Sequence, residues 1–391
     1  MSKTGQGFRT RLSHVGRAGK RVHGFVNPPL LRGSTVLYPT MAERQALAAR
    51  RGEQVLTYGL GGSQTHWALE DAIVAIEGGL RCQIVGSGLA AVTVPLLAFL
   101  NAGEHCLMPD SAYGPTRHFV ERTLPRFGIE TTFYDPEIDA DGIGGLFRSN
   151  TTVLYTESPG SHTFEVQDVP ALARVAHARG AKVLMDNTWG IHFFQPFAHG
   201  VDVSIQALTK YPGGHSDLLI GGITVNSIKD WERVRGTASA LGQYASPDDC
   251  WLCLRGVRTL GVRLAAQMEA GIAVAEWLRE RPEVKEVLHP ALPGARGHEI
   301  WKRDFTGACS LFGVVFQPEF SVDATWAFAE ALELFGIGAS WGGYESLVLP
   351  TAVTRTAGTG DFGGPLVRLH IGLEDVEDLM ADLEQGLGVM R

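Results

Sequence analysis

The stretch Asp202-Val-Ser-Ile-Gln-Ala-Leu-Thr-Lys-Tyr-Pro-Gly-Gly-His-Ser-Asp217 decides the fold of this chain. Apolar residues alternate with polar ones from Val201 to Ile205, which predicts a strand. The strand gives way to Lys210 and then to a turn rich in proline and glycine. Burial lowers the pKa of a lysine amine and makes it a nucleophile, so this position suggests that Lys210 is a reactive residue. The plainer alternative is a surface lysine in a loop.

A second motif, Met185-Asp186-Asn187-Thr188-Trp189, changes the balance between these alternatives. It follows another apolar strand, residues 181–185, and places Asp186 at the end of that strand. A carboxylate and a lysine at neighbouring strand ends fit pyridoxal phosphate, because the lysine forms a Schiff base and the carboxylate keeps the pyridine nitrogen protonated. The two motifs together therefore predict a pyridoxal phosphate site at Asp186 and Lys210.

Both motifs also carry a family resemblance. The runs Val183-Leu-Met-Asp-Asn-Thr-Trp189 and Thr209-Lys-Tyr-x-x-Gly-His-Ser-Asp217 resemble the Cys/Met-metabolism family of pyridoxal phosphate enzymes, and within it the cystathionine β-lyases. The resemblance extends from about Ser13 to the C-terminus. It implies an α/β protein of fold-type I: an N-terminal arm contacting a neighbouring subunit (1–60), a cofactor domain with a large, mainly parallel seven-stranded sheet (61–254), and a smaller C-terminal α+β domain (255–391). It also implies a homotetramer made of two active dimers.

Composition sets limits on the class of protein. The chain has 391 residues, 45% hydrophobic and 19% charged, which is an ordinary balance for a globular protein of more than one domain. The net charge of −8 argues against a nucleic-acid partner. No apolar run reaches membrane-spanning length, and the basic N-terminus lacks the apolar core of a secretory signal, so we expect a cytoplasmic protein without a membrane partner.

The cysteines indicate reduced thiols. There are five, an odd number at irregular spacing, as is usual in the cytosol. Cys250 and Cys253 form a CxxC pair, which fits either half of a zinc or redox site or two small apolar residues on a helix. The second interpretation is favoured because no other CxxC and no nearby histidine pair completes a site. We therefore expect no metal.

Periodicity predicts strands that alternate with helices, and hence a parallel sheet covered on both faces. Ligands of such sheets bind beyond the C-terminal strand ends, where Asp186 and Lys210 lie. The first 60 residues show only a short helical piece at 41–50. In the cofactor domain we expect strands at 81–85, 105–108, 129–134, 153–156, 181–185, 201–205 and 222–226, and helices at 65–76, 88–100, 112–127 and 169–179. After a long helix at 250–279 we expect strands at 284–288, 311–316 and 365–371, and helices at 323–334 and 376–387.

A glycine-rich turn after the first of these strands predicts a phosphate site. Gly86-Ser-Gly88 opens a helix, and the N–H groups of Gly88 and Leu89 at its start can bind the cofactor's phosphate. The run Gly86-Ser-Gly-Leu-Ala-Ala91 also fits GxGxxA, so a nicotinamide dinucleotide site is an alternative. The resemblance implies two further phosphate ligands, Thr209 and the Tyr58 of the adjacent subunit.

The remaining expected site residues surround the substrate. Arg368 lies among apolar residues on a strand, where it pairs either with a structural carboxylate or with the α-carboxylate of a substrate. Tyr113 is either a packing aromatic or, as the resemblance implies, stacks on the cofactor ring near the reacting atoms. Ser340, Trp341, Asn187 and Tyr58 are expected to shape the substrate site.

The expected reaction is β-elimination. The freed Lys210 amine removes the Cα proton of the amino acid, a thiolate leaves Cβ, and the remaining aminoacrylate decays to pyruvate and ammonia. Cystathionine is the expected substrate, with cystine or other cysteine S-conjugates as further ones, in methionine biosynthesis. Three features favour β- over γ-elimination: the run Ser158-Pro-Gly-Ser161, Ala339 with Trp341 before the Gly-Gly pair, and Pro115. The alternatives are a γ-lyase or γ-replacement enzyme of the family, and more remotely a non-catalytic or NAD-binding protein.

Two positions depart from the family pattern. Leu60 stands where the family usually has an arginine that binds the neighbour's phosphate, and Ala207 replaces a common serine. Losing one charge-assisted hydrogen bond to a phosphate costs roughly 1.5–3 kcal/mol. We therefore expect weaker cofactor retention, or compensation by another basic residue.

Overall fold

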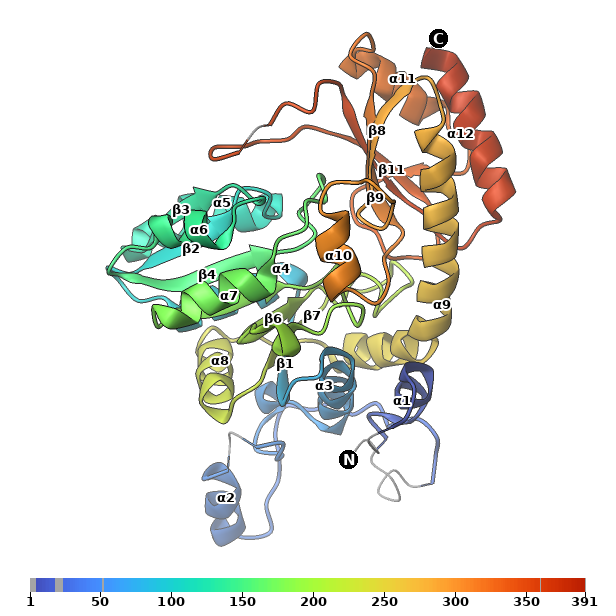
Figure 1. The fold of residues 1–391 in the computed structure, drawn as a ribbon. Coiled ribbons are helices and arrows are strands. Elements are labelled where there is room, and N and C mark those ends of the chain that lie inside the picture. The colour runs from blue at the N-terminus through green and yellow to red at the C-terminus, as the bar shows by residue number, and fades with distance from the viewer. Residues whose placement is uncertain (1–4, 18–23, 51–52, 359, 391) are drawn as a thin grey trace.

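The computed structural model describes residues 5–17, 24–50, 53–358 and 360–390. Among these residues, seven strands form one sheet (Figure 1). In spatial order they are β1 (Arg81–Val85), β7 (Gly221–Val225), β6 (Val203–Gln206), β5 (Lys182–Asp186), β4 (Thr151–Glu157), β2 (His105–Pro109) and β3 (Glu130–Tyr134). Only β7 runs against its neighbours, while the β6-β5-β4-β2-β3 pairs are parallel. The expected α/β fold with a mainly parallel seven-stranded sheet is confirmed.

Helices cover both faces of this sheet. One face packs against α3 (Gln64–Glu77), α7 (Val169–Ala178) and the first half of α9 (Pro247–Arg279). The other packs against α4 (Gly88–Phe99), α5 (Gly114–Arg122) and α8 (Ile228–Ala240). Short helices α6 (Ala140–Leu146), η3 (Leu124–Phe127) and η4 (Pro196–His199) lie in the connections. The predicted helix at 112–127 is thus two pieces, α5 and η3, which meet at Thr123, and Pro125 has no N–H with which to continue the α-helical hydrogen bonds.

Local signals set where the helices begin. Ser87 caps α4 by accepting a hydrogen bond from the Ala90 N–H, and Ser246 caps α9 just before Pro247. Ser63 and His66 exchange hydrogen bonds at the start of α3 in a capping box. These caps fix α4 with its N-terminus at the C-terminal edge of the sheet, which is the edge that carries the site.

A second sheet, of five strands in the described part of the chain, forms the C-terminal domain. Its spatial order is β10 (Gly336–Ile337), β11 (Leu347–Thr351), β12 (Leu366–His370), β9 (Leu311–Phe316) and β8 (Val284–Leu288). Helices α11 (Val322–Ala331) and α12 (Val376–Met390) pack on it, and α10 (His298–Asp304) lies between the two sheets (Figure 1). Strands β10 and β11 were not predicted.

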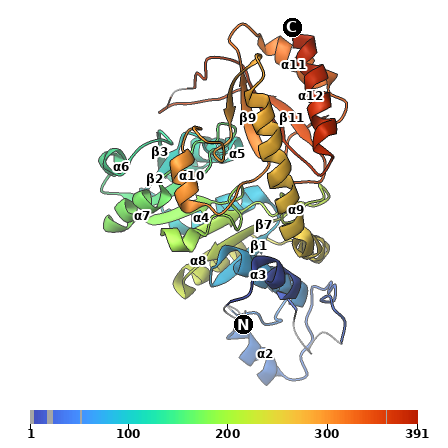
Figure 2. The same cartoon turned by 45° about the vertical axis from the view of Figure 1, so that its right-hand side comes forward.

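Helix α9 joins the two domains. Its 33 residues run from the large sheet to the small one (Figure 2). Side chains up to Leu264 belong to the core of the large domain, whereas those from Ala270 onward belong to the core of the small domain. The expected boundary between residues 254 and 255 therefore falls inside one continuous helix.

The N-terminal segment contains two helices. The first, α1 (Phe8–His14), was not predicted, and it packs on α9 and α3 through Leu12, whose side chain is 1% exposed. The second, α2 (Met41–Ala48), corresponds to the expected helical piece and buries none of its residues. Figures 1 and 2 both show α2 standing apart from the rest of the chain. A one-turn helix, η2 (Gly59–Gly61), leads from this segment to α3.

A strap, residues 352–358, leaves β11 and reaches from the small domain to α5 (Figure 1). Its backbone N–H groups at Thr356, Ala357 and Gly358 donate to the Asp110 carboxylate at 2.5, 2.6 and 3.0 Å. Arg355 forms an ion pair of 2.8 Å with Glu165, and both side chains are 4% exposed. The strap is therefore tied to the large domain by buried, charge-assisted hydrogen bonds.

Candidate functional site

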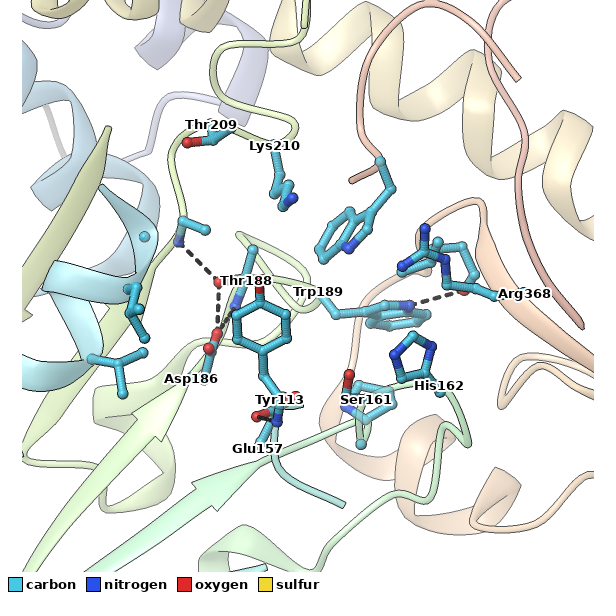
Figure 3. A pocket seen from close by; sticks show the side chains of 18 of the residues that line it. Tyr113, Glu157, Ser161, His162, Asp186, Thr188, Trp189, Thr209, Lys210 and Arg368 are labelled. Carbon is cyan, nitrogen blue, oxygen red and sulfur yellow. Dashed lines mark hydrogen bonds between the residues drawn. The ribbon is translucent and has the colours of Figure 1, made fainter. Parts of the chain in front are cut away.

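A cavity of about 260 Å³ lies where the C-terminal ends of β4, β5 and β6 meet the small domain. Side chains from both domains line it (Figure 3). Asp186 and Lys210, which the sequence predicts together, both face this cavity. They come together because Asp186 ends β5 while Lys210 follows β6, the next strand in the sheet.

Lys210 lies beneath a loop of the small domain. Its Nζ donates to the Ser340 hydroxyl at 2.7 Å and lies 5.4 Å from the ring centroid of Trp341. Gly342 in the same loop has a φ of 83°, and a Cβ there would lie 2.7 Å from the Tyr211 nitrogen, so only glycine fits. Burial, followed by the charge of Arg368, lowers the pKa of Lys210 to about 8, which Asp186 partly offsets. Its amine can therefore lose a proton near neutral pH.

Asp186 is fixed by its own turn. Its Oδ1 accepts hydrogen bonds from the Thr188 hydroxyl at 2.6 Å and from the Thr188 N–H at 3.0 Å. The Thr188 hydroxyl in turn accepts from the Ala207 N–H at 2.9 Å. Burial raises the pKa of Asp186, while the bonds from Thr188 and the charge of Lys210 oppose that rise. Thr188 therefore orients the carboxylate and links it to the strand that precedes Lys210.

A second carboxyl group, Glu157, lies beside Asp186. The two residues are partners in the register of β4 and β5. Burial, and then the charge of Asp186, raise the pKa of Glu157 well above its usual range. Its Oε2 accepts a hydrogen bond from the Tyr113 N–H at 2.8 Å. Glu157 thus holds the backbone that carries Tyr113, whose ring projects into the cavity (Figure 3).

The opposite end of the cavity is formed by the start of α4. The Ala90 and Ala91 N–H groups bond to Ser87, whereas those of Gly88 and Leu89 have no acceptor among the described residues. A Cβ on Gly88 would lie 2.7 Å from the Ala207 Cβ, so only glycine lets the start of α4 pack this closely against the turn before Lys210. Thr209 also lines the cavity, but its hydroxyl donates to the Ile220 oxygen at 3.2 Å and accepts from the Ile220 nitrogen at 3.0 Å.

Arg368 enters the cavity from β12 (Figure 3). Its Nη2 donates to the Ser340 oxygen at 2.9 Å and to the Gly338 oxygen at 3.3 Å, while its Nε is buried without a partner. No described carboxylate forms an ion pair with it. Burial lowers the pKa of Arg368 to about 10 despite an opposing contribution from Tyr113. An unpaired guanidinium of this kind suits a carboxylate that arrives from solution.

Three predicted site residues do not line the cavity: Asn187, Tyr58 and Ser340, of which Ser340 still accepts a hydrogen bond from Lys210. The Asn187 amide is fully buried behind Asp186 and donates to Glu77 Oε1 at 3.1 Å and to the Ile191 oxygen at 3.0 Å. Its direct contact with substrate is therefore not supported, because the turn points the side chain into the core. Tyr58 lies beside η2 with its side chain 56% exposed, and neither it nor Leu60 lines the cavity.

Several cavity residues were missed by sequence reasoning. Thr188, Trp189 and Glu157 stand inside or next to motifs already recognised, so their position at strand ends could have marked them. Ser161 and His162 follow β4 in an irregular turn that has no periodicity to read. Among residues that line the described cavity, only Lys210 and Arg368 are lysine or arginine, so no basic residue stands in for Leu60 there.

Other predicted features can be placed as well. Strand β1 pairs only with the antiparallel β7, so the Gly86 turn does not open a parallel βαβ unit of the kind that binds dinucleotides. All five cysteines are described, buried and unpaired, and Cys250 and Cys253 lie on α9. Among the described residues, no cluster of three or more His, Cys, Asp or Glu could hold a metal ion. None of the helices in the described ranges has both the length and the apolar character needed to cross a bilayer.

The chain is similar to known proteins over nearly its whole length. A model of the Cys/Met metabolism PLP-dependent enzymes matches residues 9–388. The chain is 49% identical to a putative cystathionine beta-lyase of Rhizobium johnstonii, covering 97% of this chain and 96% of the relative. It is 42% identical to the cystathionine beta-lyase MetC of Escherichia coli, covering 96% and 97%.

A solved structure is similar over its whole length. The crystal structure of metB from Corynebacterium glutamicum superposes with a TM-score of 0.90 at 29% identity, covering 99% of both chains. The family model and the two curated relatives likewise span almost all of this sequence. The chain therefore belongs to the Cys/Met metabolism PLP-dependent enzymes.

Proposed function

We propose that the protein is a carbon–sulfur β-lyase that converts L-cystathionine to homocysteine, pyruvate and ammonia, and that it also accepts cystine or other cysteine S-conjugates. The observation that carries the proposal is the cavity in which a lysine of lowered pKa and an unpaired arginine face each other. The names of relatives that are 49% and 42% identical support the choice of cystathionine.

The residues of the cavity fit pyridoxal 5'-phosphate. Lys210 offers an amine for its aldehyde, Asp186 a carboxylate for its ring nitrogen, and Gly88 and Leu89 free N–H groups for its phosphate. The close approach of Gly88 to Ala207 places these N–H groups beside the turn that carries Lys210, which supports the phosphate assignment. When bound, the cofactor supplies an electron sink for the electrons of the Cα–H bond. Thr209 is a weaker candidate for the phosphate, since its hydroxyl is already bonded to Ile220.

The protein's own groups perform the remaining chemistry. Arg368 holds the α-carboxylate of the amino acid and fixes its orientation. Lys210 takes the proton from Cα, which its lowered pKa allows near neutral pH. Ser340 accepts a hydrogen bond from Lys210 and so holds the amine in place at the cavity. Tyr113 and Trp341 flank the substrate and exclude water from it.

Product analysis tests the proposal against γ-elimination. Incubation of the holoenzyme with L-cystathionine is expected to release pyruvate and a free thiol in equal amounts. Release of 2-oxobutyrate instead would identify a γ-lyase. Lys210→Ala is expected to abolish both products and the part of the visible absorbance that depends on a bond between this lysine and the cofactor, whereas Lys302→Ala, at an exposed lysine on α10, is the matched control and should change neither.

The N-terminal arm supports a shared site. Apolar side chains along it are unusually exposed, with Phe25 at 80% and Leu37 at 89%. We propose that the arm covers the mouth of a neighbouring subunit's cavity with Tyr58, and that two such dimers form a tetramer. Sedimentation equilibrium of the wild type and of Leu37→Asp tests this, since the variant should dissociate. The five unpaired thiols support a cytoplasmic location for such an enzyme.

A further inference from the structure

The turn that follows β4 places a histidine in an unusual backbone conformation. His162 has a φ of 65°, in the left-handed region that disfavours residues with a side chain. Hydrogen bonds on both sides hold the turn, from the Ser161 N–H to the Ser111 oxygen at 2.9 Å and from the Phe164 N–H to the Gly160 oxygen at 3.0 Å. Strained residues of this kind cluster at functional sites, so the side chain of His162 calls for a role.

His162 stands at the wall of the substrate cavity beside Arg368 (Figure 3). Its Nδ1 is buried and has no hydrogen-bond partner among the described residues, and the same is true of the Arg368 Nε. Buried polar atoms are rarely left unpaired in a folded protein, so two on one wall of a cavity indicate a polar group that arrives from outside. A carboxylate, which accepts several hydrogen bonds, would satisfy both nitrogens.

The charge of His162 suits this role. Burial, followed by the charges of Arg368 and Arg355, lowers its pKa to about 4. The imidazole is therefore neutral at physiological pH and carries one N–H donor. A neutral donor can stand next to a guanidinium without repelling it, which a second cation in the same place could not do.

We propose that His162 is a second ligand of the substrate's α-carboxylate, donating a hydrogen bond from its ring nitrogen to the carboxylate that Arg368 holds. The strained turn keeps the imidazole at the cavity wall, and the neutral ring adds a directed bond to the charge of the guanidinium. The inference rests on the proposed amino-acid lyase function, because it takes Arg368 as the first ligand of the same carboxylate.

Two variants separate a binding role from a structural one. His162→Gly removes the donor and also relieves the backbone strain, so the variant is expected to be at least as stable as the wild type. His162→Asn keeps an N–H donor, and asparagine tolerates the left-handed conformation better than most residues. Thermal melting and the absorbance of the bound cofactor verify that each variant folds and retains its cofactor.

Binding is measured with a matched pair of ligands that cannot undergo elimination. L-Alanine carries the carboxylate, and L-alaninol has a hydroxymethyl group in its place. His162→Gly is expected to weaken the binding of L-alanine by about 10- to 100-fold, the usual worth of a hydrogen bond to a charged group, and to leave L-alaninol within about twofold. His162→Asn is expected to recover most of the affinity for L-alanine.

Two results would overturn the inference. Equal binding of L-alanine by the wild type and His162→Gly would show that the imidazole makes no contact with the carboxylate. An equal loss for both ligands would show that the residue only shapes the turn. Because neither ligand is cleaved, a failure of the lyase assay with cystathionine leaves this comparison intact, so the two failures can be told apart.

Discussion

Glu77 offers a quantitative test of the buried hydrogen bonds that hold the turn behind Asp186. The side chain lies at the end of α3, is fully buried, and accepts hydrogen bonds from Gln206 Nε2 at 2.7 Å, from Asn187 Nδ2 at 3.1 Å and from the Ser204 hydroxyl. Burial raises its pKa from 4.5 to about 8, although these three bonds oppose the rise. At neutral pH the folded protein therefore carries a protonated carboxyl group here.

The difference between the folded and unfolded pKa of Glu77 sets how pH changes the stability of the fold. A group whose pKa is raised by folding stabilises the fold fully below its unfolded pKa, and that stability is lost as pH rises toward the folded pKa. Each pH unit in this window removes about 1.4 kcal/mol. Between pH 5.5 and 8, Glu77 therefore lowers the free energy of unfolding by about 3 kcal/mol, which for a chain of 391 residues lowers Tm by about 3–4 °C.

The variant Glu77→Gln mimics the protonated acid: its amide oxygen can accept from Gln206 and Asn187, and its NH2 group, like the O–H of the acid, can donate to the Ser204 oxygen once that hydroxyl rotates to accept. We expect its Tm, relative to that of the wild type, to rise by about 3–4 °C between pH 5.5 and pH 8. Glu53→Gln, at an exposed glutamate paired with Arg50, is the matched control and should show no such divergence. Parallel Tm profiles for the wild type and Glu77→Gln between these pH values would refute the reasoning.

Three further predictions concern the strap and the two ligand ends of the cavity. Asp110→Asn should lower the free energy of unfolding by about 2 kcal/mol above pH 4, because folding lowers the pKa of Asp110 from 3.8 to about 2. The wild type should lose the same stability as the pH falls from 3.8 to 2. Faster tryptic cleavage after Arg355 in the strap reports the loss. Arg368→Lys should weaken L-alanine binding by at least about 10-fold, since a lysine cannot form the bidentate fork, and unchanged affinity would exclude carboxylate recognition there. Leu60→Arg should tighten cofactor binding to the apo-enzyme by about 10-fold or more through the neighbouring subunit, and an unchanged dissociation constant would show that retention needs no arginine.

Much of the cofactor domain could be predicted because its signals are local. Each expected strand of the large sheet is present within a few residues, since buried parallel strands read as short apolar runs between glycine-rich turns. The pairing of Asp186 with Lys210 followed from one rule, that neighbouring parallel strands end at the same edge. The register of β5 with β6 agrees with that rule.

The missed elements have weak or interrupted patterns. Strand β11 contains Pro350, which argues against a strand in sequence reasoning, and β10 has only two residues. Helix α8 buries only four of its thirteen residues, so its apolar face is narrow. The short α1 has one fully buried side chain and no side-chain cap.

The missed site residues depend on partners far away in the sequence. Glu77 meets Ser204 and Gln206 across more than 120 positions, so no window of sequence could reveal a protonated carboxyl group there. The role proposed for His162 depends on its neighbour Arg368, which lies on a strand of the other domain. Asn187 was placed in the site because it follows Asp186, but the turn directs adjacent side chains to opposite sides.

Helix α9 joins the domains along the chain, and the strap on Asp110 and the hydrogen bond from Trp189 to the Leu311 oxygen are among the contacts that hold them together. The two domains cannot separate around the cavity without breaking the hydrogen bonds between the strap and Asp110. The cavity is already open at its rim, where Leu89 and Tyr113 are 39% and 43% exposed. Entry at this rim needs no separation of the domains, so Leu89 and Tyr113 are among the first side chains that an arriving amino acid meets.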